Sequence, residues 1–334
     1  MAKKTSEEAV TTVVDTGTST TTFLRSLVPR LLRLSADQAS FQARGFPHSP
    51  AQRSLETVGR TFIVGYNTAL AAPHLDNIIQ YIRSQPLDER GFAAEGAAMG
   101  VAVVDAVPFR KPMLPAFVTA LDSKYTYLVH VGCGWAIARV PWRRKQILAS
   151  LDSVHRWLAM DGLGFHDTYF YHKRVLAGWR REQSGYAARA YDQGVGRALW
   201  FVAGGSAASA IRLVLGLPNE RQGDLWSGLG LAMAYAGPAG QTEAAAALAT
   251  ADRNAASYAQ GVAFACEAHA LALHAPTHTD VVARSIWNLS ACEVAGLVRQ
   301  ARAGLSKAPS DPPQYQNWRD SVAQAFLSVG RDRS

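Results

Sequence analysis

Short glycine motifs recur along this chain at a fixed interval, and the interval constrains the fold more than any single residue does. Three of them, Glu95–Gly100 (EGAAMG), Asp161–His166 (DGLGFH) and Ser227–Ala232 (SGLGLA), lie 66 residues apart, and Glu293–Leu297 (EVAGL) follows after another 66. Similar segments stand about half-way between them, at Val131–Ala136 (VGCGWA), Gln193–Ala198 (QGVGRA) and Gln260–Ala265 (QGVAFA). The underlying period is therefore about 33 residues, which is typical of stacked helical hairpins.

The glycines themselves favour close helix packing. A glycine in the middle of a helix costs roughly 1 kcal/mol relative to alanine, so a series of them needs compensation. Two helices whose facing residues lack side chains can approach closely, and the resulting packing compensates for the cost of the glycines. A phosphate-binding loop is excluded, because its glycines follow a strand and open a helix.

Composition agrees with a helical chain. Apolar residues make up 48% of the 334 residues, which is enough for a large core, and charged residues make up only 18%. We expect an all-α fold: a superhelical, TPR-like array of helical hairpins with capping helices at both ends. Residues 1–22 are predicted to be a disordered tail and residues 23–330 a single α-helical repeat domain. The basic, amphipathic segment 23–34 is either the N-terminal capping helix or a helix that contacts a membrane surface or a partner.

The net charge of +8 and the pI near 9.5 suit an acidic partner. Nucleic acid is not expected, because the arginines are scattered and no groove-reading motif is present. An acidic carrier protein and a lipid surface are both compatible with this positive charge. Three unpaired cysteines, the lack of a signal peptide and the lack of a membrane-spanning apolar run favour the cytoplasm.

The second copy of the motif departs from the others. Small or apolar residues follow copies one and three, whereas polar and aromatic residues (Asp167, Tyr169, Tyr171, His172 and Lys173) follow copy two. His166 itself replaces the Gly100 and Ala232 of those copies. A polar ring at a helix-facing position needs a hydrogen-bond partner or a cavity. This run is either a satisfied structural cluster or a functional site.

Acidic or hydroxyl residues recur at one position of the repeat, namely Glu95, Asp161, Ser227 and Glu293. They are either structural groups or, where two carboxylates share an apolar site, acid and base groups. His269, His274 and His278 lie close in sequence, but their spacing matches no common metal site, so no metal is predicted. The tryptophans near the motifs, Trp135 and Trp226 among them, are either core residues or an aromatic lining for a flat, apolar ligand.

Several of these segments occur together in a known family. Residues 43–46 (ARGF), 95–100 (EGAAMG), 130–135 (HVGCGW), 161–166 (DGLGFH), 191–197 (YDQGVGR) and 224–228 (DLWSG) resemble, in order and spacing, the UnbL-type family of enediyne biosynthesis proteins. The resemblance covers about residues 23 to 327. It implies a protein that acts beside an iterative polyketide synthase and helps to turn a linear polyene precursor into the enediyne core.

Two hypotheses follow from these observations. In the first, the array binds and helps to convert an apolar polyene, with His166, His172, Asp161 and Tyr169 as the catalytic set and Arg197 holding an acidic end. The further residues expected to bind substrate are Trp226, Trp135, Glu95, His130, Asp192 and Gln193. In the second, the protein is a non-catalytic scaffold that binds an acidic carrier protein or other polyketide pathway enzymes. The residues do not indicate a cofactor. A deep apolar pocket would favour the first hypothesis and an open groove the second.

Overall fold

The computed structural model describes residues 32–331, except residues 109–110, 122, 182, 307 and 309. All regular secondary structure within these residues is helical, so the predicted all-α class is confirmed. Residues 1–31 lie outside the described part, and so do the predicted tail and most of the predicted helix over residues 23–34.

One set of helices is apolar on nearly every side and forms the core. In α5 (Arg90–Val104), for example, every residue except Arg90 is buried. A helix without a polar face is stable only between other helices. The other inner helices are α3 (Gln52–Ala71), α7 (Thr126–Arg139), α9 (Trp157–Leu176), α10 (Tyr186–Val202), α12 (Gln222–Tyr235) and α14 (Ala255–Leu271).

Shorter outer helices join successive inner ones and bury one face. Ala207, Ala210 and Val214 are the buried residues of α11 (Ala207–Leu215), and their spacing of three and four gives one apolar stripe. The other outer helices are α4 (Leu75–Ser84), α6 (Leu114–Ala120), α8 (Arg144–Ala149), α13 (Gln241–Ala251) and α15 (Thr277–Trp287). Short 3-10 turns, η2 (Pro141–Arg143), η3 (Asn219–Arg221) and η4 (Asp252–Asn254), precede α8, α12 and α14.

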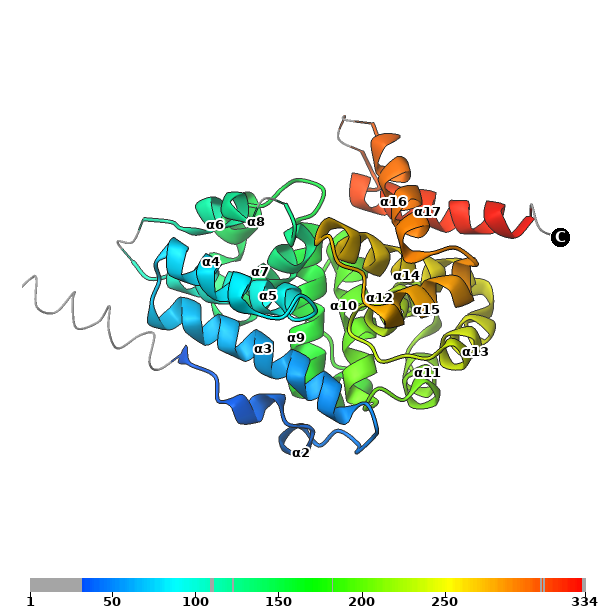
Figure 1. The fold of residues 1–334 in the computed structure, drawn as a ribbon, viewed down its shortest axis with the longest axis horizontal. Coiled ribbons are helices and arrows are strands. Elements are labelled where there is room, and N and C mark those ends of the chain that lie inside the picture. The colour runs from blue at the N-terminus through cyan, green and yellow to red at the C-terminus, as the bar shows by residue number, and fades with distance from the viewer. Residues whose placement is uncertain are drawn as a thin grey trace, which may run out of the picture.

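The two ends carry further helices. At the N-terminal end lie η1 (Ala36–Ala39) and α2 (Phe41–Arg44), and at the C-terminal end α16 (Ala291–Ala303) and α17 (Gln314–Arg331). Helix α17 packs on α14 and α16 and so covers the last inner helix, as predicted for a C-terminal capping helix. Figure 1 shows α16 and α17 at the upper right, beyond α14.

Each inner helix packs on the next inner helix of the chain, from α3 to α14 (Figure 1). Tyr127, near the start of α7, contacts His155, just before α9, with ring centroids 5.4 Å apart. Further along both helices, Trp135 contacts Phe165 at 5.3 Å. Helices α7 and α9 therefore run in the same direction, and the outer segments carry the chain back between them.

The glycine motifs hold these neighbours together. In α9, Gly162 lies against the carbonyl of Val131 in the preceding helix, and Gly164 lies against the carbonyl of Tyr191 in the following helix. A Cβ at either position would overlap the carbonyl oxygen. The same reciprocal arrangement recurs in α7, α10 and α12, so the predicted helix-packing role of the glycines is confirmed there.

The fourth copy of the motif does not belong to this series. Gly296 lies in α16, where an added Cβ would meet no atom within 4 Å. Glu293 is exposed and caps the start of α16, since its carboxylate accepts from the Ser290 backbone N–H at 2.8 Å. The prediction that this segment repeats the other copies is therefore wrong in structural terms.

Two helical sequence patterns are interrupted in the structure. The pattern over residues 187–217 is divided into α10 and α11 at Gly204 and Gly205, whose φ angles are +69° and +73°. The pattern over residues 143–158 is interrupted after Ala149, and the Asp152 carboxylate accepts from the backbone N–H of His155 at 3.0 Å in the turn that follows.

The row of inner helices curves back on itself. Phe92 of α5 contacts Tyr235 of α12 with ring centroids 5.3 Å apart, although several inner helices lie between them in the chain. The inner helices therefore surround a central space. Whether their hairpins form a TPR-like superhelix stays a prediction.

Candidate functional site

A cavity of about 640 Å³, counting its open mouth, lies among the inner helices. Aromatic side chains from α3, α5, α7, α9 and α10 form much of its wall; among them are Phe62, Phe92, Trp135, Phe165, Tyr169 and Phe201. Leu34 and Gln38 line it from the N-terminal segment. A concave, mostly apolar cavity with few polar groups is the common form of a small-molecule site.

The glycine motifs place these side chains. The residue directly after the second glycine is Trp135 in α7, Phe165 in α9, Arg197 in α10 and Leu231 in α12, and all four line the cavity. The glycines face the neighbouring helices, so the next residue along the turn points toward the central space. One repeat position therefore supplies one wall residue from each helix, and Arg197 is its charged member.

Arg197 forms a buried ion pair. Its Nη1 donates to Oδ1 of Asp161, and the side chains of Arg197 and Asp161 are only 8% and 1% exposed. The guanidinium also lies over the Phe165 ring, 5.1 Å from its centroid. Since Asp161 already neutralises this cation, Arg197 is better placed to contact a π-system than to hold a free acid.

Glu95 is the second ionisable group in the cavity wall. Burial raises the pKa of Glu95 to about 7, the Asp161 carboxylate adds to the rise, and Arg197 opposes it. Burial also raises the pKa of Asp161, against the effect of Arg197. A carboxyl group with a pKa near neutrality can both donate and accept a proton at pH 7.

Two more of the predicted residues support the cavity wall. Tyr169 lines the cavity, and its hydroxyl donates to the Gln38 carbonyl at 3.3 Å. His166 lies behind the wall, edge-on to Trp135 with ring centroids 5.5 Å apart, and its Nδ1 is 3.1 Å from Oδ1 of Asp167. Burial lowers the pKa of His166, so the ring is neutral at pH 7 and holds Trp135 in place.

Other predicted residues lie away from the cavity. His172 is partly buried and packs on Phe46 with ring centroids 5.3 Å apart. Trp226 is fully buried against Tyr258. His130 is buried near the start of α7, where its Nδ1 is 2.7 Å from the Thr126 carbonyl oxygen. None of these three lines the cavity.

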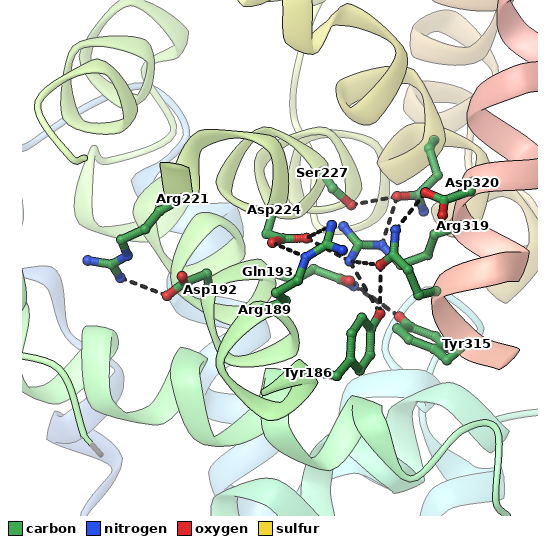
Figure 2. A network of polar contacts seen from close by, with 12 residues as sticks. Tyr186, Arg189, Asp192, Gln193, Arg221, Asp224, Ser227, Tyr315, Arg319 and Asp320 are labelled. Carbon is green, nitrogen blue, oxygen red and sulfur yellow. Dashed lines mark hydrogen bonds and ion pairs between the residues drawn. The ribbon is translucent and has the colours of Figure 1, made fainter. Parts of the chain in front are cut away.

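Gln193 instead belongs to a set of polar contacts between α10, α12, α14 and α17, and Asp192 forms a separate ion pair with Arg221 of η3 (Figure 2). Asp192 accepts from Arg221 at 2.8 Å. Gln193 donates through Nε2 to the Tyr315 hydroxyl at 3.2 Å. These interactions are those of helix packing rather than of ligand binding.

Arg319 of α17 is the centre of this set and was missed by sequence reasoning. Its Nη1 donates to Asp224 at 2.8 Å and its Nε to Gln260 at 3.2 Å, and the residue is 4% exposed (Figure 2). Nothing in the sequence around Arg319, such as Trp318 or Asp320, indicates that this arginine is buried. An arginine in a terminal helix is usually exposed to solvent.

The histidines near the end of α14 do not converge. His269 and His278 both approach the Tyr235 carbonyl, at 3.4 and 3.3 Å, whereas His274 pairs with Asp88. Among the described residues no group of three or more His, Cys, Asp or Glu side chains is arranged to hold a metal ion.

Within the same residues no single helix is long and apolar enough to cross a bilayer. Helices α15 and α16 meet the length and composition of a membrane span only when they are taken together, and they are bent by 69° relative to each other.

Comparison with known protein families gives a match over most of the chain. Residues 23–326 match the family described as "Protein of unknown function (DUF1702)". No curated protein and no solved structure matches the chain.

Proposed function

The chain belongs to the DUF1702 family, and we propose that it is an accessory protein of enediyne polyketide biosynthesis that binds a linear, apolar polyene intermediate. In this proposal the polyene lies in the central cavity, and the protein helps to convert it toward the enediyne core. One observation carries the proposal: aromatic side chains from successive inner helices converge on one cavity with Glu95 and Arg197 in its wall.

The lining of the cavity suits a conjugated chain. Apolar surface removed from water contributes roughly 25 cal/mol per Å² to binding. Rings such as Phe165 and Tyr169, which are nearly parallel with an interplanar angle of 16°, offer flat faces for stacking. The Arg197 guanidinium adds a cation that the π-system of the ligand can contact.

Glu95 supplies proton chemistry to the proposal. As the protonated acid it can transfer its proton to one carbon of a polyene, and the carboxylate that remains can remove a proton from another carbon. This pair of transfers shifts double bonds and leaves the oxidation state of the ligand unchanged. Of the residues predicted to be catalytic, Tyr169 lines the cavity and Asp161 acts through Arg197. We assign the proton transfer to Glu95 rather than to His166 or His172.

A pair of valines on α3 allows a matched test of binding. Val58 lines the cavity, whereas Val64 is 46% exposed on the same helix. Diphenylhexatriene, an apolar polyene whose fluorescence rises when it leaves water, serves as the probe. We expect saturable binding by the native protein and by Val64→Trp, and at least tenfold weaker binding by Val58→Trp. Absence of saturable binding to the native protein, or equal binding by both variants, would sink the proposal.

The place in the pathway needs its own experiment. In a reconstituted polyene-to-core reaction, Glu95→Gln should bind the intermediate as the native protein does but leave it unconverted. Full conversion by this variant would refute the role of Glu95.

One observation favours the scaffold function as a second candidate. Trp142 is 73% exposed, and Lys145, three residues further along the helical segment, is also exposed, so an aromatic ring and a basic group lie on one surface. Such a surface suits an acidic carrier protein. Binding of the purified carrier protein of the synthase, lost in Trp142→Ala, would support this function, whereas the same affinity for both proteins would refute it.

A further inference from the structure

A second cavity, of about 420 Å³ counting the open space at its mouth, lies next to the first. Its wall is again mostly apolar and includes Leu128, Val131, Leu158, Phe264, Tyr315 and Trp318. Two of these residues, Val131 and Phe264, belong to the glycine motifs Val131–Ala136 and Gln260–Ala265.

The two cavities follow one another along the inner helices. In α7 the second cavity is lined by Leu128 and Val131, and the first by Trp135, one turn further along. In α9 the second cavity is lined by Leu158, and the first by Phe165 and by residues that follow it. Since α7 and α9 run in the same direction, the cavities are stacked along the axis of the ring.

Side chains alone separate the two cavities. Arg197, Leu231 and Tyr235 line both of them. Tyr235 is held by stacking on His269, with ring centroids 4.2 Å apart, and Arg197 is held by its ion pair. Leu231 is only partly buried, because it faces hollow space, so it is the partition residue with room to change rotamer.

Helix α17 closes the far end. Tyr315 and Trp318 line the second cavity, and both are 1% exposed. The Trp318 indole donates to the Val298 carbonyl at 2.9 Å, and Arg319 beside it is tied to Asp224. This end wall is therefore fixed, whereas Leu34 and Gln38 of the N-terminal segment line the first cavity at the other end.

We propose that the two cavities form one elongated site, in which a single apolar polyene passes Leu231 and ends against Trp318. This inference rests on the proposed function and adds a selection by chain length. From Leu158 to Phe170, α9 rises about 18 Å at 1.5 Å per residue, which approximates the length of chain that the site accepts. Arg197, neutralised by Asp161, faces the middle of that chain.

Diphenylpolyenes of increasing length test the inference. Stilbene is short enough for the first cavity alone, whereas diphenyloctatetraene needs both. Ala268 of α14 lines only the second cavity, so Ala268→Phe fills that space. Ala246→Phe, at an exposed position of α13, is the matched control. If Ala268→Phe lacks the helical circular dichroism of the native protein, Leu128→Phe fills the same cavity from α7 and takes its place.

We expect the filled variant to bind stilbene within twofold of the native affinity and diphenyloctatetraene at least tenfold more weakly. The control should bind both as the native protein does. Unchanged affinity of the filled variant for diphenyloctatetraene, with stilbene still bound, would overturn the single-site inference and leave the proposed function intact. Failure of the native protein to bind a diphenylpolyene of either length would overturn both.

Discussion

Glu95 combines two features that rarely occur together in a structural residue. It lies at 4% exposure in the wall of an apolar cavity, and it shares one arginine with a second carboxylate, Asp161. Two carboxylates around one buried cation cannot both be fully compensated, so one of them holds a proton more tightly. The recurrence of acidic residues at this repeat position indicated such a pair, but Ser227 and Glu293 at the same position have no part in it.

The raised pKa of Glu95 predicts a pH dependence of stability. The folded protein holds the Glu95 proton up to about pH 7, whereas a glutamate in the unfolded chain releases it near 4.5. Between these values the folded state binds more protons, so ionisation of Glu95 lowers the free energy of unfolding as the pH rises. Glu95→Gln removes this loss, which is on the order of 3 kcal/mol.

Urea unfolding at pH 4.5 and pH 8 measures the effect. The stability of Glu95→Gln relative to the native protein should increase between the two pH values. Glu267 also has a pKa raised to about 7 by burial, but it is unchanged in the variant and cancels in the comparison. A difference between the two proteins that does not vary with pH would show that Glu95 is ionised throughout.

At the scale of single residues, some of the predicted site residues line the cavity and others do not. Trp135, Arg197 and Glu95 line the cavity because they lie at fixed steps from the glycines of their motifs. Trp226 and His130 also lie in or near motifs but face other helices. Helical periodicity gives the angle between two side chains on one helix, whereas the direction of the cavity depends on how the helices are arranged around it.

The glycine motif is the device that holds one element to the next. Its first glycine packs on the preceding helix and its second on the following helix, so both flanks of an inner helix approach backbone to backbone. Such contact needs residues without a side chain, and it explains why helices with two interior glycines are stable here.

Two glycine-to-alanine substitutions should have opposite effects. In Gly194→Ala the new Cβ would overlap the carbonyl oxygen of Asp161 and force α10 away from α9. We expect a loss of several kcal/mol and a melting temperature lower by about 5 °C or more. In Gly296→Ala the Cβ meets no atom, so the higher helix propensity of alanine should stabilise the protein by up to about 1 kcal/mol. Thermal unfolding followed by circular dichroism measures the stability of both variants. Equal stability of the two variants would contradict the packing role of the motif glycines.

Most elements follow from the sequence pattern, although some of their ends do not. Residues 125–131 favour a strand locally, yet Thr126–Arg139 is helix α7. Burial on all sides, and the close packing of Gly132 and Gly134 on the neighbouring helices, outweigh that local preference. At the break before α9 the Asp152 carboxylate accepts from the backbone N–H groups of Val154 and His155, and a periodic pattern does not reveal such contacts.

For the whole molecule, the period predicted the succession of helices but not the closure of their row. A repeat of about 33 residues fixes which helix follows which, whereas curvature depends on small rotations between neighbours. Contacts such as Phe92 with Tyr235 close the ring, and no pattern in the sequence pairs these two residues. The central cavity is a consequence of that closure.

Helix α17 completes the enclosure through Arg319. Arg319→Leu leaves Asp224 with Arg189 as its ion-pair partner, and Arg189 is 49% exposed on its side chain. Removing one partner of a buried ion pair costs roughly 3–5 kcal/mol. We therefore expect α17 to detach more often, which amide hydrogen exchange over residues 314–329 would register as faster exchange. Ser321→Ala, at an exposed position of the same helix, is the control, and equal exchange in both variants would contradict the role of Arg319.

The most direct test of the central claim is a crystal structure of the protein with diphenyloctatetraene. Our account predicts one continuous density along the axis of the inner helices, from Phe170 past Leu231 to Trp318, with Glu95 and Arg197 in contact with it. Density for the polyene on the outer surface, with the two cavities occupied by water, would contradict the account.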